Sequence, residues 1–484
     1  MSGTVTIFYG AVATPVCPRT WKALPRCLIV VGRYGNINFM REHVEDRKLD
    51  EVLRERGYAD HHVKGLQDGE FIIPGFVDTH THAPQYPNLG KGGQYTLLQW
   101  LENVIFPKEA EFANTKFAKE VYHEVVRRSL AFGTTTSCYY GSFHLAATTI
   151  LADIVNHHGQ RAFIGKCNMD RKETLPDYYV EDSAEQSIKE TECLINHIRS
   201  LAPRSQDAAV GTAPEPLVQP ILSPRFALAC TRECLSGLRD LAHRYNHEHP
   251  DEPRIRIQTH IAENRKEVKE VLKYYPEAES YTQVYDNYGL LRDTTILGHS
   301  VHLSPGEVLL IKKRDAGISH CPTSNFYLSS GIAPVGEYLD AGVKVGLGTD
   351  VSGGYAVSML NVIQNASIAS KILAVEAGLP DPEEIPCQDF YLATLGGARV
   401  CNLSEKIGSF SEGKSFDALV VSVLDDTGAT GVWGMEAKSD GDYKKKREKL
   451  EENLERFMFC GDDRNILKVY VQGCLVGGRS FVPQ

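Results

Sequence analysis

Residues 71–82 read Phe-Ile-Ile-Pro-Gly-Phe-Val-Asp-Thr-His-Thr-His, an apolar run that closes on two histidines. The apolar part is typical of a buried strand. Side chains two positions apart on a strand point to the same face, so His80 and His82 can present two imidazole nitrogens to one ion. A His-x-His pair alone is more often structural. The stretch therefore predicts a buried strand and makes a metal site at its end one hypothesis.

Further apolar segments follow residues 71–82, and they alternate with segments of helical pattern, as in parallel α/β architectures. Eight βα units predict a (β/α)8 TIM-type barrel over residues 73–403, with its chemistry at the C-terminal ends of the strands. A doubly wound open sheet is disfavoured, because Gly346-Leu347-Gly348 lacks the third glycine of a dinucleotide-binding loop. The eight predicted strands end near these residues: His82, Tyr140, Asp170, Phe226, Glu263, His299, Asn325 and Asp350.

Both ends of the chain carry short strand candidates outside the barrel pattern. Near the start they cover residues 4–8, 26–31 and 36–40, followed by a charged helical stretch at 47–56; near the end they cover 416–423 and 466–472, separated by a charged helix at 443–457. We expect the two ends to share one sheet. They would form a small β-sandwich domain from residues 1–72 and 404–484.

Composition places the 484-residue chain among ordinary globular proteins, with 42% apolar and 24% charged residues. A net charge of −10 excludes a broad electrostatic attraction to nucleic acid or anionic membranes. The twelve cysteines form no Cys-x-x-Cys pair, and no apolar stretch approaches the ~20 residues that cross a bilayer. The N-terminus also lacks a secretory pattern. We expect a cytoplasmic protein without nucleic-acid or membrane partners.

Other strand ends offer metal ligands on the face predicted for His80 and His82. His260 and His299 close two later strands, and Asp350 follows the last one. Nitrogen ligands with one carboxylate suit Zn²⁺, with Fe²⁺ as the alternative, and a set without thiolate favours a catalytic over a structural site. The sequence therefore predicts one catalytic metal at the mouth of the barrel.

These motifs, in this order, resemble those of the amidohydrolase superfamily of metal-dependent deaminases and hydrolases. Within it the resemblance is strong to the guanine deaminase family and covers most of the chain. The motifs at His80 and Asp350 identify only the superfamily, whereas Gln85 and Arg225-Phe226 point to guanine. The matching segments are residues 83–86, 98–101, 223–226, 258–265, 319–325, 346–350 and 461–465.

The resemblance implies hydrolytic deamination of guanine to xanthine and ammonia by a metal-activated water, in a homodimer. It implies that one metal is held by His80, His82, His260 and Asp350, the same four residues that the strand ends suggest. Binuclear members carry a lysine at the end of strand four. Here that strand ends on Pro224-Arg225-Phe226, so a single metal is expected.

Deamination needs a nucleophile, an acid and a base. A bound divalent ion lowers the pKa of its water from 15.7 to about 7, and a ring nitrogen must gain a proton before ammonia leaves. Glu263 lies three residues past His260, within reach of the substrate, and is the predicted proton shuttle. The resemblance implies that Asp350 takes a proton from the water and that His299 orients it.

Specificity for guanine requires hydrogen bonds to its O6 and N1 edge, because unpaired polar groups in a buried site can reject an analogue by ~10⁴ to 10⁵. The amide of Gln85 both donates and accepts, and the guanidinium of Arg225 only donates, which fits a carbonyl beside an N–H. Phe226 and Trp100 are predicted to stack on the ring. The last predicted substrate contact is His260.

Two other functions stay open. A related amidohydrolase deaminase could act on another purine, a pterin or a triazine ring, since fold analogy does not separate these substrates. A non-catalytic scaffold on the same barrel is disfavoured, because all four predicted ligands and Glu263 are present. The cytidine-deaminase type is excluded, since no Pro-Cys-x-x-Cys motif accompanies His43-Val44-Glu45.

Overall fold

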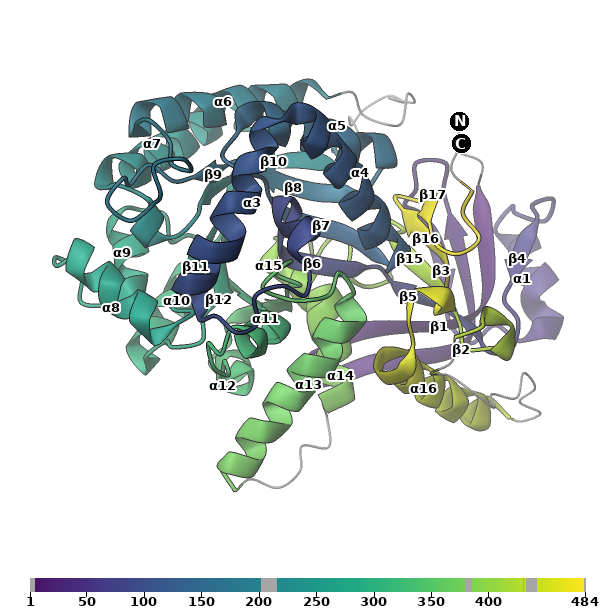
Figure 1. Cartoon of the computed structure of the whole chain (residues 1–484). Helices are drawn as coiled ribbons and strands as arrows, with labels where there is room; N and C mark the ends of the chain where they lie inside the picture. The colour runs from purple at the N-terminus through teal and green to yellow at the C-terminus, as the bar shows by residue number, and fades with distance from the viewer. Residues whose placement is uncertain (1–4, 202–215, 379–384, 430, 432–441, 483–484) are drawn as a thin grey trace.

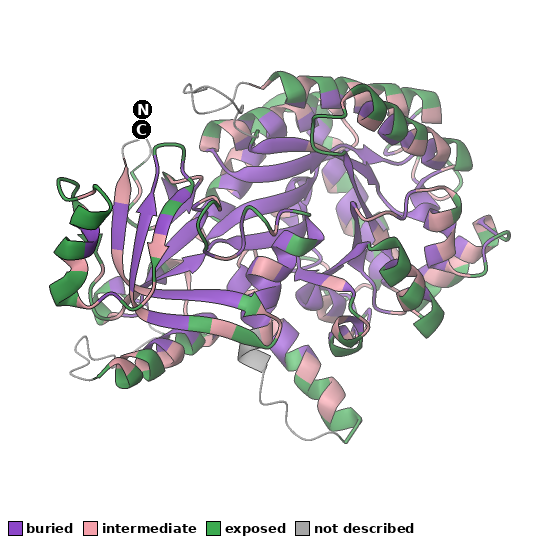
Figure 2. Ribbon diagram, turned by 180° about the vertical axis from the view of Figure 1, so that it is seen from behind, coloured by how far each residue is buried: buried purple, intermediate pink, exposed green. Residues whose placement is uncertain are grey.

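The structure is a computed structural model that describes residues 5–201, 216–378, 385–429, 431 and 442–482. Figure 1 shows a barrel ringed by helices and, beside it, a smaller sheet built from both ends of the chain. The barrel strands are buried along most of their length, while the surrounding helices expose their outer sides (Figure 2). Among the described residues no helix combines the length and apolarity needed to cross a bilayer.

The barrel sheet follows the chain order β6-β7-β8-β10-β11-β12-β13-β14, and each neighbouring pair is parallel. Its first and last strands meet where Asp350 N–H donates to the carbonyl of His80 at 2.8 Å, and where the Thr79 hydroxyl donates to the carbonyl of Leu347 at 2.8 Å. The TIM-type barrel is confirmed. The strands are β6 Phe76–His82, β7 Thr134–Tyr140, β8 Arg161–Gly165, β10 Val218–Pro224, β11 Arg256–Ile261, β12 Thr295–His299, β13 Gly317–His320 and β14 Lys344–Leu347.

Helices surround the barrel (Figure 1). Thr231 caps α7, its hydroxyl accepting from Cys234 N–H, and the apolar residues of that helix recur every three or four positions and are buried. The seventh strand ends earlier than predicted, at His320, because Pro322 already begins helix α11. The main helices are α4 Thr115–Ala131, α5 Leu145–His158, α6 Ala184–Ser200, α7 Arg232–Glu248, α8 Arg265–Tyr274, α9 Tyr281–Asn287, α10 Pro305–Arg314, α11 Pro322–Tyr327, α12 Val335–Asp340 and α13 Met359–Glu376.

A long connection after β6 crosses the mouth of the barrel before α4 begins. It contains short helical pieces separated by turns, and it carries Gln85, Trp100 and Glu109. Thr96 caps one of these pieces with Gln99 in a reciprocal capping box, which fixes the local turn. The pieces are η2 Ala83–Asn88, α2 Leu97–Trp100, η3 Leu101–Ile105, α3 Phe106–Ala110 and η4 Glu111–Ala113.

The smaller sheet joins the two ends of the chain, as predicted. Its strand order is β17-β16-β15-β5-β1-β2-β3. The rings of Phe8 on β1 and Tyr470 on β16 lie 5.5 Å apart although β5 and β15 separate these strands, so the sheet curls on itself around an apolar core. Its strands are β1 Thr6–Cys17, β2 Thr20–Val31, β3 Ile37–Arg41, β4 Val63–Gly65, β5 Glu70–Pro74, β15 Ala418–Ser422, β16 Ile466–Val471 and β17 Cys474–Gly477. The domain division at residues 72 and 404 stays a prediction.

Two contacts fasten the smaller sheet to the barrel. Arg161 at the start of β8 forms a buried bidentate ion pair with Asp417 beside β15, at 2.9 and 3.2 Å. The charged helix α16, Tyr443–Cys460, buries one apolar face there, and its Phe457 ring stacks on Phe76 at 6.5 Å. The role of this helix, which the sequence left open, is therefore structural: it covers the joint between the two parts.

Candidate active site

Four predicted metal ligands gather at the C-terminal end of the barrel strands. The Nε2 atom of His260 lies 3.2 Å from that of His80 and 3.0 Å from that of His82. The Oδ1 atom of Asp350 lies 3.4 Å from Nε2 of each of the latter two. Metal–nitrogen distances of about 2.0–2.1 Å place tetrahedral ligand atoms about 3.3 Å apart. The observed separations therefore fit the edges of a four-coordinate site.

The protonation of the three imidazoles supports a cation at this point. Burial lowers the pKa of His80, His82 and His260, so all three are neutral near pH 7 and can each offer a nitrogen lone pair to a metal ion. Nδ1–H of His260 donates to the carbonyl of Arg225, which leaves the Nε2 lone pair facing the cluster. Nδ1 of His80 and of His82 finds no partner within the described ranges. The donor set therefore fits a divalent metal such as zinc.

His299 lies beside this cluster and faces two carboxylates. Its Nδ1 is 3.0 Å from Oδ1 of Asn325, and its Nε2 is 3.5 Å from Glu263 and 3.7 Å from Asp350. It also belongs to a group of potential ligands with His80, His260 and Asp350, whose ligand atoms all lie within 4.8 Å of one another and in which His299 stands in place of His82. Burial alone would lower the pKa of His299, but the two carboxylates outweigh it and the net shift is upward. This histidine therefore lies where it can hold a proton between the two carboxylates.

Glu263 sits just beyond β11, where a backbone turn aims it into the barrel. Ala262 has a left-handed φ of 48°, and Glu267 accepts the N–H groups of Glu263 and Asn264 at 3.0 and 3.2 Å. Ser330 donates its hydroxyl to Oε1 of Glu263 at 3.1 Å. Burial, partly offset by His299, raises the pKa of Glu263 to about 7. A carboxyl with that pKa can give and take a proton near neutral pH.

The predicted substrate contacts surround one pocket with the cluster at its base. Trp100 comes from the connection after β6, and its indole N–H donates to the carbonyl of Lys91 at 3.2 Å. Phe226 stands edge-on to His260 with ring centres 6.5 Å apart. Of the ten predicted site residues, His80 alone is not part of the pocket lining. The other nine line the pocket: His82, Gln85, Trp100, Arg225, Phe226, His260, Glu263, His299 and Asp350.

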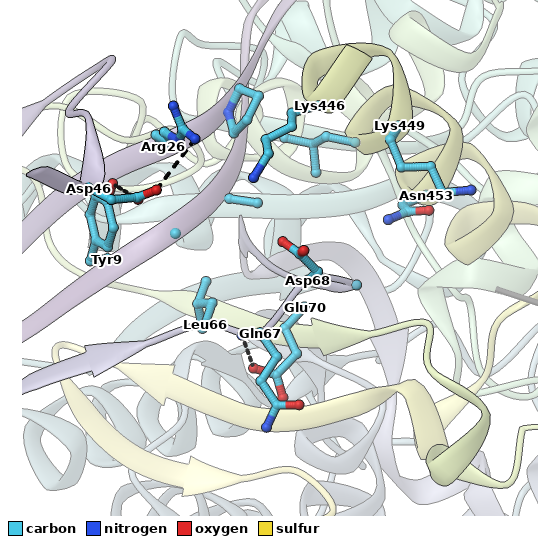
Figure 3. Close-up of a pocket in the computed structure, with 15 residues that line it drawn as sticks. Tyr9, Arg26, Asp46, Leu66, Gln67, Asp68, Glu70, Lys446, Lys449 and Asn453 are labelled. Atoms are coloured by element: carbon cyan, nitrogen blue, oxygen red, sulfur yellow. Dashed lines mark hydrogen bonds and ion pairs between the residues drawn. The ribbon is translucent and has the colours of Figure 1, made fainter. Parts of the chain in front are cut away.

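A second cleft opens elsewhere, between α16 and the smaller sheet (Figure 3). Its volume is about 120 Å³, and it contains no predicted site residue. Its charged side chains balance in sign, and Arg26 already pairs with Asp46 at 3.4 Å. The charged lining residues are Arg26, Lys446, Lys449, Asp46, Asp68 and Glu70. The pocket at the barrel mouth, which holds the predicted site residues, therefore remains the candidate active site.

Comparisons with known proteins agree with this geometry. A model described as the Amidohydrolase family matches residues 71–476, from the strand before β6 to the last strand of the smaller sheet. The chain belongs to the amidohydrolase family. The family predicted from the strand-end motifs is thereby confirmed.

This amidohydrolase is 40% identical over 474 residues to the guanine deaminase of Dictyostelium discoideum, with 97% of each chain covered. It is 38% identical over 473 residues to the guanine deaminase of Homo sapiens, covering 97% of this chain and 95% of the other. A solved guanine deaminase from C. acetobutylicum with bound guanine in the active site superimposes with a TM-score of 0.82 at 33% identity. That comparison covers 98% of this chain and 100% of the other.

The sequence did not reveal several residues that support the site of this amidohydrolase. Tyr140 ends β7, and its ring packs against those of His80 and His82 at 4.9 and 4.5 Å. Glu109 is buried against Arg225, although it lies in a charged segment of the kind that is usually exposed to solvent. Tyr140 could have been found from its place at a strand end, whereas Glu109 carries no such signal.

We predict that the amidohydrolase retains about one divalent metal per chain through dialysis, because four buried protein side chains can hold the ion. His82→Ala removes one buried ligand and should reduce the metal content severalfold, measured by elemental mass spectrometry. The control is His247→Ala, at an exposed position on α7. Metal-free wild-type protein, or equal loss from both variants, would contradict the assignment of the site.

Proposed function

We propose that this amidohydrolase deaminates guanine by hydrolysis, releasing xanthine and ammonia. The observation that carries the proposal is the composition of the pocket. Gln85 and Arg225, which suit the carbonyl edge of a purine, line the same space as His82, Glu263 and Asp350. Relatives that carry the name guanine deaminase align with the chain over nearly its whole length.

In this reaction the oxygen of water bonds to C2 of guanine, the bond from C2 to the exocyclic nitrogen breaks, and ammonia leaves. A divalent metal, when held by His80, His82, His260 and Asp350, supplies a water acidic enough to act near neutral pH. Glu263 donates a proton to N3 of the ring, which makes C2 more electrophilic. It then takes the remaining proton from the oxygen now bonded to C2 and passes it to the departing amine.

Two further side chains handle the proton of the attacking water. Asp350 accepts the first proton of this water, because burial, which would raise its pKa, is outweighed by His299 and His80 and its carboxylate is ionised beforehand. That proton returns to Glu263 before the next turnover. His299, held by Asn325 through Nδ1, directs Nε2 at the space between Asp350 and Glu263. It orients the water there. These are the roles that the family resemblance implies for Asp350 and His299.

Recognition is assigned to the opposite wall of the pocket. Arg225 and Gln85 bond to O6 and N1–H of guanine, while Phe226 and Trp100 pack on the faces of the ring. His260 contacts the substrate from the metal side. Adenine places an amino donor where Arg225 also donates, which leaves two buried donors facing each other.

We predict that incubation with guanine, adenine, cytosine or 8-oxoguanine releases ammonia efficiently from guanine alone, with adenine slower by at least about 10⁴-fold. Ammonia release is measured by a coupled assay, and His82→Ala serves as the inactive control. Turnover of adenine, cytosine or 8-oxoguanine without turnover of guanine would overturn the assignment.

A second prediction isolates the proton shuttle. Glu263→Gln keeps the shape of the side chain but cannot exchange a proton, so kcat should fall by about 10² to 10⁴. The metal content should stay unchanged. Glu270→Gln, at an ion-paired position on the outer side of α8, is the matched control and should retain wild-type kcat. A near-normal kcat for Glu263→Gln would remove this residue from the mechanism.

The metal is assigned as Zn²⁺, with Fe²⁺ as the alternative. Three imidazole nitrogens and one carboxylate oxygen in a four-coordinate arrangement are ligands that zinc prefers. The elemental analysis above identifies the ion, and a metal other than these two would exclude the assignment. The cytoplasmic location expected from the sequence stays a prediction.

We also propose a homodimer, as the family resemblance implies. Helix α13 extends from the body of the barrel (Figure 1) and exposes Ile368, Ile372 and Val375 on one face, with exposed fractions of 51%, 37% and 75%. An apolar stripe at this spacing suits packing against a second copy.

Light scattering should therefore give twice the chain mass of 53.7 kDa. Ile372→Glu places a charge in the stripe and should shift the protein to monomer. The control Leu309→Glu, at an exposed apolar position on α10, should leave the dimer intact. A monomeric wild-type protein would rule out the dimer, and a dimeric Ile372→Glu variant would exclude this interface.

A further inference from the structure

Arg225 places a positive charge in the wall of the pocket. This charge is almost fully shielded from water, since only 2% of the surface of Arg225 is exposed. The guanidinium meets the carboxylate of Glu109, itself 1% exposed, through both terminal nitrogens: Nη1 donates to Oε2, and Nη2 donates to Oε1 at 3.1 Å. Burial by itself would lower the pKa of Arg225, but Glu109 reverses the shift. Glu109 thus compensates a buried cation and fixes the plane of its guanidinium.

The same carboxylate sets the orientation of Gln85. Nε2 of this amide donates to Oε1 of Glu109 at 2.9 Å, and its Oε1 accepts the backbone N–H of Ser352 at 3.0 Å. A flipped amide would set oxygen against oxygen at Glu109 and N–H against N–H at Ser352. One orientation alone satisfies both neighbours, so one amide N–H and one oxygen lone pair of Gln85 remain for a ligand.

Glu109 has no acceptor capacity left for a substrate. Oε1 accepts from Gln85 and Arg225, and Oε2 accepts from Arg225 and from the hydroxyl of Tyr179 at 2.7 Å. These four hydrogen bonds fill the usual lone-pair sites of a carboxylate. Glu109 therefore acts through its neighbours, and Tyr179 holds the carboxylate in place from the side away from the pocket.

We propose that Glu109 is the positioning residue for specificity. It aligns Gln85 and Arg225 as a single unit that reads the carbonyl and N–H edge of a 6-oxopurine. This inference rests on the proposed function. Because that edge is bound equally in the ground state and the transition state, loss of Glu109 should raise KM far more than it lowers kcat.

The test compares Glu109→Gln with Glu111→Gln. Glu111 lies two positions along the chain, is half exposed and pairs with Lys108 at 2.7 Å, so its variant controls for the loss of one charge. For each protein, KM and kcat are measured with guanine. Inhibition constants are measured with hypoxanthine, which keeps the O6 and N1–H edge, and with purine, which lacks it.

For Glu109→Gln we expect KM to rise about 10- to 100-fold with kcat within about threefold of wild type. The inhibition constant of hypoxanthine should rise in parallel, while that of purine stays within about twofold. Glu111→Gln should match wild type throughout. Unchanged KM and hypoxanthine binding would overturn the proposal. So would a lower kcat at constant KM, or equal weakening of hypoxanthine and purine.

If Glu109→Gln does not fold, Tyr179→Phe tests the same proposal, since the Tyr179 variant leaves no buried charge without its partner. It should raise KM and hypoxanthine inhibition constants about two- to fivefold, again without affecting purine. Wild-type kinetics for a folded Tyr179→Phe would then overturn the proposal. The two hypotheses fail differently: a wild-type enzyme that releases no ammonia from guanine refutes the proposed function, whereas an active one with insensitive variants refutes only the role of Glu109.

Discussion

Three buried imidazoles bring their Nε2 atoms together, two of them to within 3.2 Å of that of His260, beside the carboxylate of Asp350, and this arrangement suits a cation at the point between them. Burial keeps His80, His82 and His260 neutral, and a backbone carbonyl fixes the tautomer of His260. The parallel barrel makes the arrangement available, because the C-terminal ends of its strands converge.

The two carboxylates of the site have opposite electrostatic environments. Asp350 is surrounded by imidazoles that overcome the effect of burial, so its pKa falls below the usual range. Glu263 lies farther out, where burial dominates and raises its pKa to about 7. His299 lies between them and is stabilised as a cation by both. Such a pair suits a reaction that needs one permanent base and one group that cycles between acid and base.

The opposite wall of the pocket has a different origin. It comes mainly from the connection after β6 and from the residues that follow β10, which meet through the buried pair of Glu109 and Arg225. The candidate metal ligands thus lie at strand ends, whereas Gln85 lies on a loop that one ion pair holds in place. The smaller sheet and α16 contribute no residue to the pocket, and they pack against the far side of the barrel instead.

The sequence by itself determined the features that recur along the chain, namely the alternation of strands and helices and the polar residues at the strand ends. Alternating apolar and helical segments predicted the barrel, and polar residues at strand ends predicted that the candidate metal ligands and Glu263 lie together, because parallel strands place their ends on one rim. Only the tertiary structure decided where Glu109 lies and which side chains it contacts. Its neighbours Lys108 and Glu111 form an ordinary exposed pair. Nothing local distinguishes it from them, since its partner Arg225 lies 116 positions away and meets it only when the loop folds over the barrel.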